Sequence, residues 1–220
     1  MQSSTIHYQR AVPRNKLPIQ RGFSLVEIAL AIALIAGAIV AGLLAVNRIR
    51  LDQQLNSARN DAMATMNAAI TAYASYAKTT GATPAVLTTQ KIWPEERVTD
   101  PGLGTATVRG HFPGSREYMW ENKAIWPDVA AATGFMYHVT NIPASQCAQL
   151  LSSMAAHPNV FRAYAGTYRG DPTDGAVPTG GATSLTAVKT STAAPVNVSS
   201  LATACQGKAK KHLAVAFFKN

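Results

Sequence analysis

The chain has 220 residues, 47% of them hydrophobic and 14% charged, and its mean hydropathy is +0.02. This length suits one domain, and so few charged residues imply that some segment concentrates apolar side chains. The net charge is +9, but +4 of it lies in residues 1–22, which hold no acid. The rest of the chain therefore lacks the clustered charge of a nucleic-acid-binding domain, and two cysteines exclude a disulfide-dense scaffold.

The apolar residues are concentrated in residues 23–46, where 20 of 24 residues are apolar. As a helix this segment would be about 36 Å long, which is enough to cross a hydrocarbon core of roughly 30 Å. The preceding basic residues favour a cytoplasmic position for residues 1–22, although Arg48 and Arg50 follow the segment and oppose that orientation.

Glu27 is the only acid in this apolar segment. A secretory signal would have a shorter apolar region with a small-residue cleavage site after it, and a plain membrane anchor would not explain the acid. Acids inside a membrane helix are costly and are functional by default. A cut between Gly22 and Phe23 would create an α-amine that could pair with Glu27 within one chain or between chains, which suggests self-association.

The motif "RGFSLVE", followed by an apolar helix, resembles the class III signal of type IV pilins and pseudopilins. The resemblance implies cleavage by a prepilin peptidase between Gly22 and Phe23, N-methylation of the new Phe23 amine, and a role in assembly for Glu27. The long leader, the mature chain of 198 residues and the stretch "NIPASQCAQLL" resemble the type IVb branch, including major subunits of plasmid-encoded thin conjugative pili. Phe23 as the first mature residue is instead typical of type IVa pilins and pseudopilins.

The following segment, from Arg48 to Thr79, contains neither proline nor glycine. Its apolar or small residues recur at gaps of three and four, which indicates one side of a helix: Leu51, Leu55, Ala58, Ala62, Met66, Ala69, Tyr73 and Tyr76. We expect one helix over residues 23–79, stopped by Gly81 and Pro84, whose second half packs on a globular head. In its first half a run of small residues, Ala29, Ala33, Gly37, Ala41 and Ala45, would allow close helix packing.

Residues 80–220 are expected to form an α+β head, so that the whole chain has the pilin fold: a long N-terminal helix packed on a small antiparallel sheet. The helix expected in the head covers residues 144–156, and residues 166–184 are expected to form an exposed loop. The strands expected in the head are Thr105–Arg109, Phe135–Val139, Val160–Tyr164, Thr186–Lys189 and Leu213–Phe218.

Cys147 and Cys205 are 58 positions apart. In an exported head they are expected to form one disulfide, because export places them in an oxidising compartment; two free buried thiols are the alternative. The resemblance implies that the bracketed region, residues 147–205, forms much of the subunit contact surface and exposed face.

An enzymatic function finds little support, and no cofactor or metal site is expected. The five histidines are scattered, and Ser115 does not lie in a nucleophile elbow. Glu95, Glu96, Asp171 and Asp174 are interpreted as solvated loop acids, and the Asn197-Val198-Ser199 glycosylation pattern as a chance occurrence.

We therefore expect a structural subunit of a type IVb pilus used for attachment or mating-pair stabilisation. It would lie in the bacterial inner membrane with its head in the periplasm, then polymerise with itself into a surface pilus. Its partners would be the prepilin peptidase and the assembly platform with its ATPase. A minor pilin or type II secretion pseudopilin is one alternative. A DNA- or surface-binding tip pilin using Lys208, Lys210, Lys211 and His212 is another, although no specific nucleic acid is expected.

Overall fold

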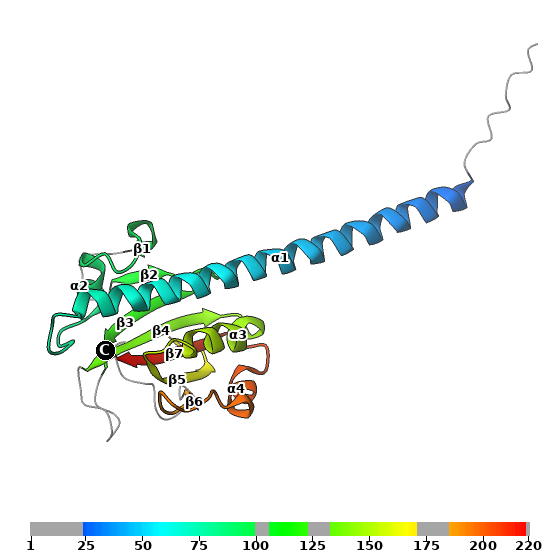
Figure 1. Ribbon diagram of the computed structural model, residues 1–220. Coiled ribbons are helices and arrows are strands. Elements are labelled where there is room, and N and C mark those ends of the chain that lie inside the picture. The colour runs from blue at the N-terminus through cyan, green and yellow to red at the C-terminus, as the bar shows by residue number, and fades with distance from the viewer. Residues whose placement is uncertain (1–23, 100–105, 123–132, 171–184, 219–220) are drawn as a thin grey trace, which may run out of the picture. The chain divides into compact units, whose positions relative to one another are not determined.

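The computed structural model describes residues 24–99, 106–122, 133–170 and 185–218. The chain divides into two compact units, Met1–Val46 and Asn47–Asn220. Helix α1, Leu25–Tyr73, begins in the first unit and ends in the second (Figure 1).

In the first unit, every described residue from Leu25 onward is helical and exposed. The helix lacks proline here, and Gly37 and Gly42 are both accommodated within it. By length and composition α1 is suited to cross a membrane: its most apolar window has a mean hydropathy of 2.7, and none of that window is buried.

The second unit contains a seven-stranded antiparallel sheet in the order β1-β2-β3-β4-β7-β5-β6 (Figure 1). The C-terminal strand β7 is thus central, between β4 and β5. The strand bounds are β1 Val98–Thr99, β2 Thr107–Arg109, β3 Arg116–Glu121, β4 Gly134–Ile142, β5 Val160–Thr167, β6 Thr186–Lys189 and β7 Lys211–Phe218.

The main core lies on one face of this sheet. Alternate residues of β4, such as Phe135 and Tyr137, point to this face, because side chains of a strand alternate between the two sides. They pack with Leu213 and Val215 of β7 and with the buried side of α1. The opposite face has a smaller apolar cluster, whose buried members are Met136, Phe161, Tyr164, Leu185, Ala214 and Ala216.

Among its described residues, the second unit also has three short α-helices and one 3-10 helix. They are α2 Pro84–Thr89, η1 Glu95–Arg97, α3 Ala144–Ala155 and α4 Val198–Cys205. Thr83 caps α2 through Val86 N–H, and Asn197 caps α4 through Ser200 N–H. The apolar side of α3, which includes Leu150, Leu151 and Met154, belongs to the main core. The expected α+β architecture, a long N-terminal helix with an antiparallel sheet, is confirmed.

The buried side of α1 in the second unit is the one that the spacing predicts. Six of the eight expected positions are buried, while Leu51 is half-buried and Tyr76 is exposed. The helix ends at Tyr73 rather than Thr79. Thr79 leaves the helical path because its buried hydroxyl donates to Gly134 O at 2.8 Å, and Gly81 N–H donates to Glu121 at 2.8 Å. These bonds draw the connection onto the ends of β3 and β4.

The five expected strands correspond to β2, β4, β5, β6 and β7, and the bounds of β6 are as predicted. The expected α3 is also present, ending one residue earlier, at Ala155. Strands β1 and β3 and helices α2 and α4 were not predicted from the sequence. Most of the expected loop 166–184 lies outside the described residues, although Gly166 and Thr167 belong to β5.

The expected disulfide between Cys147 and Cys205 is confirmed, with their Cα atoms 5.6 Å apart. It joins the first turn of α3 to the last residue of α4, and both cysteines lie in the main core. Two free thiols, the alternative interpretation, are excluded.

Candidate functional site

The start of α1 is formed by reciprocal hydrogen bonds between Ser24 and Glu27. Ser24 N–H donates to Glu27 Oε2 at 2.9 Å, and Glu27 N–H donates to Ser24 Oγ at 3.2 Å. This arrangement is a capping box, which satisfies two N–H groups that a helix start leaves without partners. The carboxylate of Glu27 therefore has a local structural role in addition to any role in assembly.

The sequence carries a local signal for this cap. Ser-x-x-Glu before an apolar run is the capping-box pattern, and here it is Ser24-Leu25-Val26-Glu27. The two residues of the expected cleavage site, Gly22 and Phe23, lie outside the described residues. The structure therefore leaves the processing and methylation expectations untested.

Beyond the cap, α1 exposes a continuous apolar surface in the first unit. The exposed fraction of its large aliphatic side chains there ranges from 46% at Val46 to 85% at Leu25. An exposed apolar surface of this extent marks a membrane or protein interaction site.

Within the second unit, a network of charged side chains connects α1 to the sheet. Asp61 on α1 accepts from Arg97 Nη1 at 2.9 Å and pairs with His111 Nε2 at 2.7 Å. Arg97 also pairs with Glu117, which accepts from the Tyr137 hydroxyl at 2.5 Å. Arg97 and Glu117 are both largely buried, so each charge depends on its partners.

The pKa values of two buried members of the network, Tyr137 and Arg97, differ from their ordinary values. Burial, and then the neighbouring carboxylate of Glu117, raise the pKa of Tyr137 well above its ordinary value, so the phenol remains a hydrogen-bond donor. Burial alone would lower the pKa of Arg97, but attraction to the carboxylates of Glu117 and Asp61 outweighs it and raises that pKa. The network is thus a fixed ionic link rather than a proton-transfer site.

Two buried histidines from neighbouring strands meet on the other face of the sheet. His138 Nδ1 lies 3.0 Å from His212 Nε2, and the His138 ring contacts Trp120 edge-on. Burial, and then the nearby His212, lower the pKa of His138 well below its usual value. His138 is consequently neutral at pH 7, which matches its place in an apolar layer.

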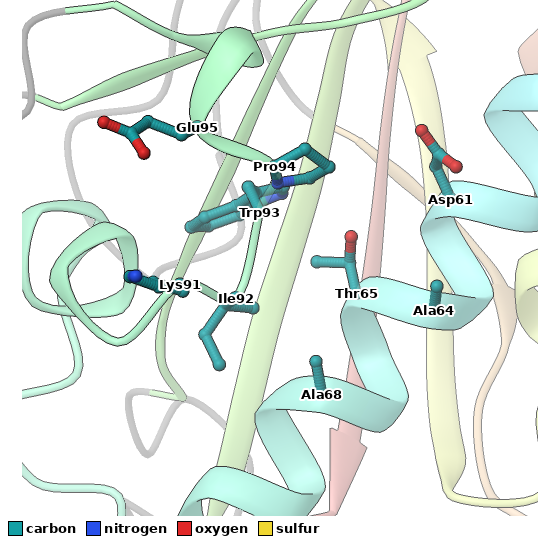
Figure 2. Close-up of a pocket in the computed structure, with 9 residues that line it drawn as sticks. All are labelled: Asp61, Ala64, Thr65, Ala68, Lys91, Ile92, Trp93, Pro94 and Glu95. Atoms are coloured by element: carbon teal, nitrogen blue, oxygen red, sulfur yellow. The ribbon is translucent and has the colours of Figure 1, made fainter.

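A hollow of about 380 Å³ lies between α1 and the segment from Lys91 to Glu95 (Figure 2). Ala64, Thr65 and Ala68 of α1 form one wall, and Ile92 and Trp93 lie across from them. The small α1 side chains create the space, and its lining is mainly apolar. Among the described lining residues, no nucleophile is paired with a base.

The basic cluster predicted at residues 208–212 is divided by the fold. Lys208 and Lys210 are exposed, but Lys211 and His212 begin β7 and are 3% exposed. Lys211 Nζ donates to Gln206 O at 2.6 Å. Burial of Lys211 and His212 therefore leaves only Lys208 and Lys210 of this cluster available to a partner.

The remaining predicted polar sites have structural explanations. Glu95 and Glu96 are exposed in η1, as expected for solvated acids. Asn197 of the glycosylation pattern is engaged as the cap of α4, while Asp171 and Asp174 lie outside the described residues. Within the described ranges, no three or more metal-ligating side chains gather in one place.

No protein-family model and no curated protein matches the chain. Among solved structures, it is similar to TcpA, a type IV pilin from Vibrio cholerae El Tor biotype. The identity is 17%, the alignment covers 74% of this chain and 98% of the other, and the TM-score is 0.46. These values are low, so the fold assignment rests on the helix and sheet of this chain.

Proposed function

We propose that this chain is the precursor of a type IV pilin, a structural subunit that polymerises into a surface filament. The observation that carries the proposal is the start of α1. An exposed apolar helix suited to cross a membrane begins at a cap whose carboxylate, Glu27, is the only acid of its apolar segment. A single-span anchor needs the apolar residues but not the acid.

The proposed maturation is cleavage between Gly22 and Phe23 by a prepilin peptidase, with N-methylation of the Phe23 amine. Removing residues 1–22 deletes a charge of +4 and leaves an amine close to the helix start. The Ser24–Glu27 cap involves only residues beyond the cut, so it is compatible with cleavage. A carboxylate accepts several hydrogen bonds, so Glu27 can cap its own helix and also pair with the amine of a neighbouring copy.

In this proposal the subunit waits in the bacterial inner membrane with its head in the periplasm. The assembly platform and its ATPase then add it to a filament whose interior is built from α1 helices. The exposed aliphatic side chains of residues 25–46 support a transfer of α1 from the membrane into the filament. On assembly they would exchange their lipid contacts for contacts with other helices. The Cys147–Cys205 disulfide fits an oxidising compartment.

We further propose the type IVb branch and a role in attachment or mating-pair stabilisation, on the long leader and the "NIPASQCAQLL" stretch. A minor pilin or secretion pseudopilin has the same N-terminus and remains the second candidate. A DNA-binding tip pilin is less well supported, because burial of Lys211 and His212 leaves only Lys208 and Lys210 of that cluster exposed.

The test is to shear filaments from the surface of cells that carry this gene, then to image them and identify their subunits by mass spectrometry. A major pilin would be the dominant chain of the filament, whereas a minor pilin would be present at a few copies. Filaments of normal yield and composition in cells lacking this chain would contradict a structural role.

A further inference from the structure

A half-buried arginine on α1, Arg59, has no partner within the part of the chain that the structure describes. Its Nε atom is buried, and no described acceptor lies within hydrogen-bond distance of it. The residues three and four positions away on α1, which could pair with it on the helix surface, are Leu55, Asn56, Ala62 and Met63, and none of them is an acid. A buried donor without a partner is costly, so this guanidinium needs an explanation.

Arg59 lines a hollow of about 380 Å³ between α1 and α3. The α3 residues that line it are uncharged, and they are Ala148, Gln149, Ser152 and Ser153. Gln149 and Ser152 are exposed, so the hollow can be reached from solvent. Arg59 is therefore the single charge among the described residues of this hollow. Such a site fits a carboxylate, because the planar guanidinium can donate two parallel hydrogen bonds to its oxygens.

Three acids in the described part of the second unit have no hydrogen-bond or ion-pair partner among the described residues: Asp52, Glu95 and Glu96. Glu95 and Glu96 are adjacent and exposed in η1. The next residue, Arg97, does not neutralise them, because it is already engaged in the charged network. The Glu95 carboxylate points away from the α1 side chains (Figure 2). Helix η1 thus presents a negatively charged surface to solvent.

The arginine and the acids of η1 lie on different sides of α1. Asp61, which pairs with Arg97 at the end of η1, is two positions from Arg59, and side chains two positions apart on a helix point about 200° apart. Asp52 lies seven positions before Arg59 and therefore on the same side of α1 as the arginine. One copy thus carries a positive site on one side of α1 and an acidic surface, that of η1, on another.

We propose that Arg59 of one copy pairs with the acidic pair of η1, Glu95 and Glu96, of the next copy, an inference that rests on the polymerisation proposed above. A contact between two different surfaces repeats without closing, and identical copies build an open helical filament in this way. Asp52 would instead join like sides of two copies, and such a contact closes after a dimer. The carboxylate would satisfy the buried Arg59 donor, and the opposite charges would fix the register of neighbouring copies.

Charge reversal tests the contact on the full chain in cells. Arg59→Glu and the double variant Glu95→Arg/Glu96→Arg should each lower the yield of sheared filaments by about tenfold or more, because like charges would face each other at every contact. The amount of each variant in the membrane pool should stay normal. Arg169→Glu reverses an exposed arginine outside both surfaces and is the matched control, so its filament yield should equal that of the parent chain.

Expressing the two reversed chains together separates repulsion from misfolding. In the mixture, each chain carries the charge that the other chain's surfaces require, so alternating copies regain opposite charges at every contact. Filaments should return and contain the two chains in equal amounts by mass spectrometry. One chain that carries all three changes should also assemble, because its two surfaces are again opposite in charge.

The outcomes distinguish this contact from the function on which it rests. Normal filament yield from Arg59→Glu, or a mixture of the two reversed chains that still forms no filaments, would overturn the contact between Arg59 and η1. Both results would leave the proposed pilin function standing, provided that the parent chain assembles. Surface filaments that lack the parent chain would instead contradict the proposed function, and the contact with it.

Discussion

Glu27 combines a cap with a charge, and the two can be separated by substitution. Its side chain closes the capping box with Ser24, and in the proposed filament its charge neutralises the Phe23 amine of a neighbour. Glutamine at this helix position also caps, but it carries no charge. Alanine removes both the cap and the charge.

We predict that Glu27→Gln abolishes filaments while the protein remains cleaved and abundant in the membrane. The reason is that an unpaired amine buried among apolar helices is strongly unfavourable. Ser24→Ala is the matched control: it removes a cap contribution of about 1 kcal/mol but keeps the charge, so filaments should persist. Quantitative immunoblots of sheared and membrane fractions measure both outcomes. Normal filament yield in Glu27→Gln cells would show that the charge is not an assembly group.

His138 makes the second unit sensitive to acid. The folded state lowers its pKa below the unfolded value of about 6.5, so the unfolded state binds the proton more readily. Stability attributable to this residue is therefore fully present above pH 6.5 and is lost as the pH falls below that value. We predict that the thermal unfolding midpoint decreases as the pH is lowered from 7 to 5.

The pH dependence should be smaller in His138→Phe, which keeps an aromatic ring beside Trp120 but does not titrate. Part of the pH dependence should remain in this variant, because burial and then the nearby Lys189 also lower the pKa of His157. Circular dichroism melts of both proteins at several pH values measure the difference. Identical slopes for the two proteins would remove His138 from the explanation.

At the scale of elements, the ionic network holds the second half of α1 to the sheet. Arg97→Met would leave Glu117 buried without its cation, and breaking a buried pair in this way costs about 3 kcal/mol or more. We predict a lower unfolding midpoint for Arg97→Met and a substantial recovery in the double variant Arg97→Met/Glu117→Leu, because the second change removes the stranded charge. Denaturant titrations of all three proteins test this, and a double variant no better than the single would argue against the network.

The disulfide joins α3 to α4 across 58 positions of sequence. In the chain-entropy model, closing a loop of this size stabilises the folded state by about 4 kcal/mol. Cys147→Ser and Cys205→Ser should therefore each lower the abundance of the exported subunit, and the double variant should be no worse than either. Pulse-chase measurement of subunit half-life gives the result. Full abundance of either single variant would mean that the bond is dispensable.

The elements that sequence predicted are those with a strong local signal. The three- and four-residue spacing from Leu55 to Tyr73 identified the buried side of α1, and the runs around Phe135 and Val215 identified central strands. Strand β3 was missed because its two ends are charged, at Arg116 and Glu121. Helix α4 is short, and its cap, Asn197, was interpreted only as a glycosylation pattern.

The candidate site was predicted only in part, for a different reason. Gly22, Phe23 and Glu27 follow from a local motif, whereas the ionic network joins Asp61, Arg97 and Glu117, which are far apart in sequence. The burial of Lys211 and His212 could not be predicted because it follows from the central position of β7.

At the scale of the whole molecule, the two units of the chain differ in what stabilises them. The first unit supplies an exposed apolar helix that needs other helices or lipid around it, and the second has its own core, sheet and disulfide. A membrane-held precursor that becomes a filament subunit accounts for both features. In the proposed conversion residues 1–22 are removed, since their four basic residues would otherwise enter the apolar interior of the filament.

The measurement that tests this conversion most directly is the intact mass of this chain in sheared surface filaments. We predict a mature chain of 198 residues that begins at Phe23, with an added methyl group if the amine is modified. A bulky residue in place of Gly22 should leave the leader attached and the filaments absent, because access to the cut is blocked. Assembled filaments whose subunit still begins at Met1 would contradict the proposed maturation and, with it, the pilin mechanism.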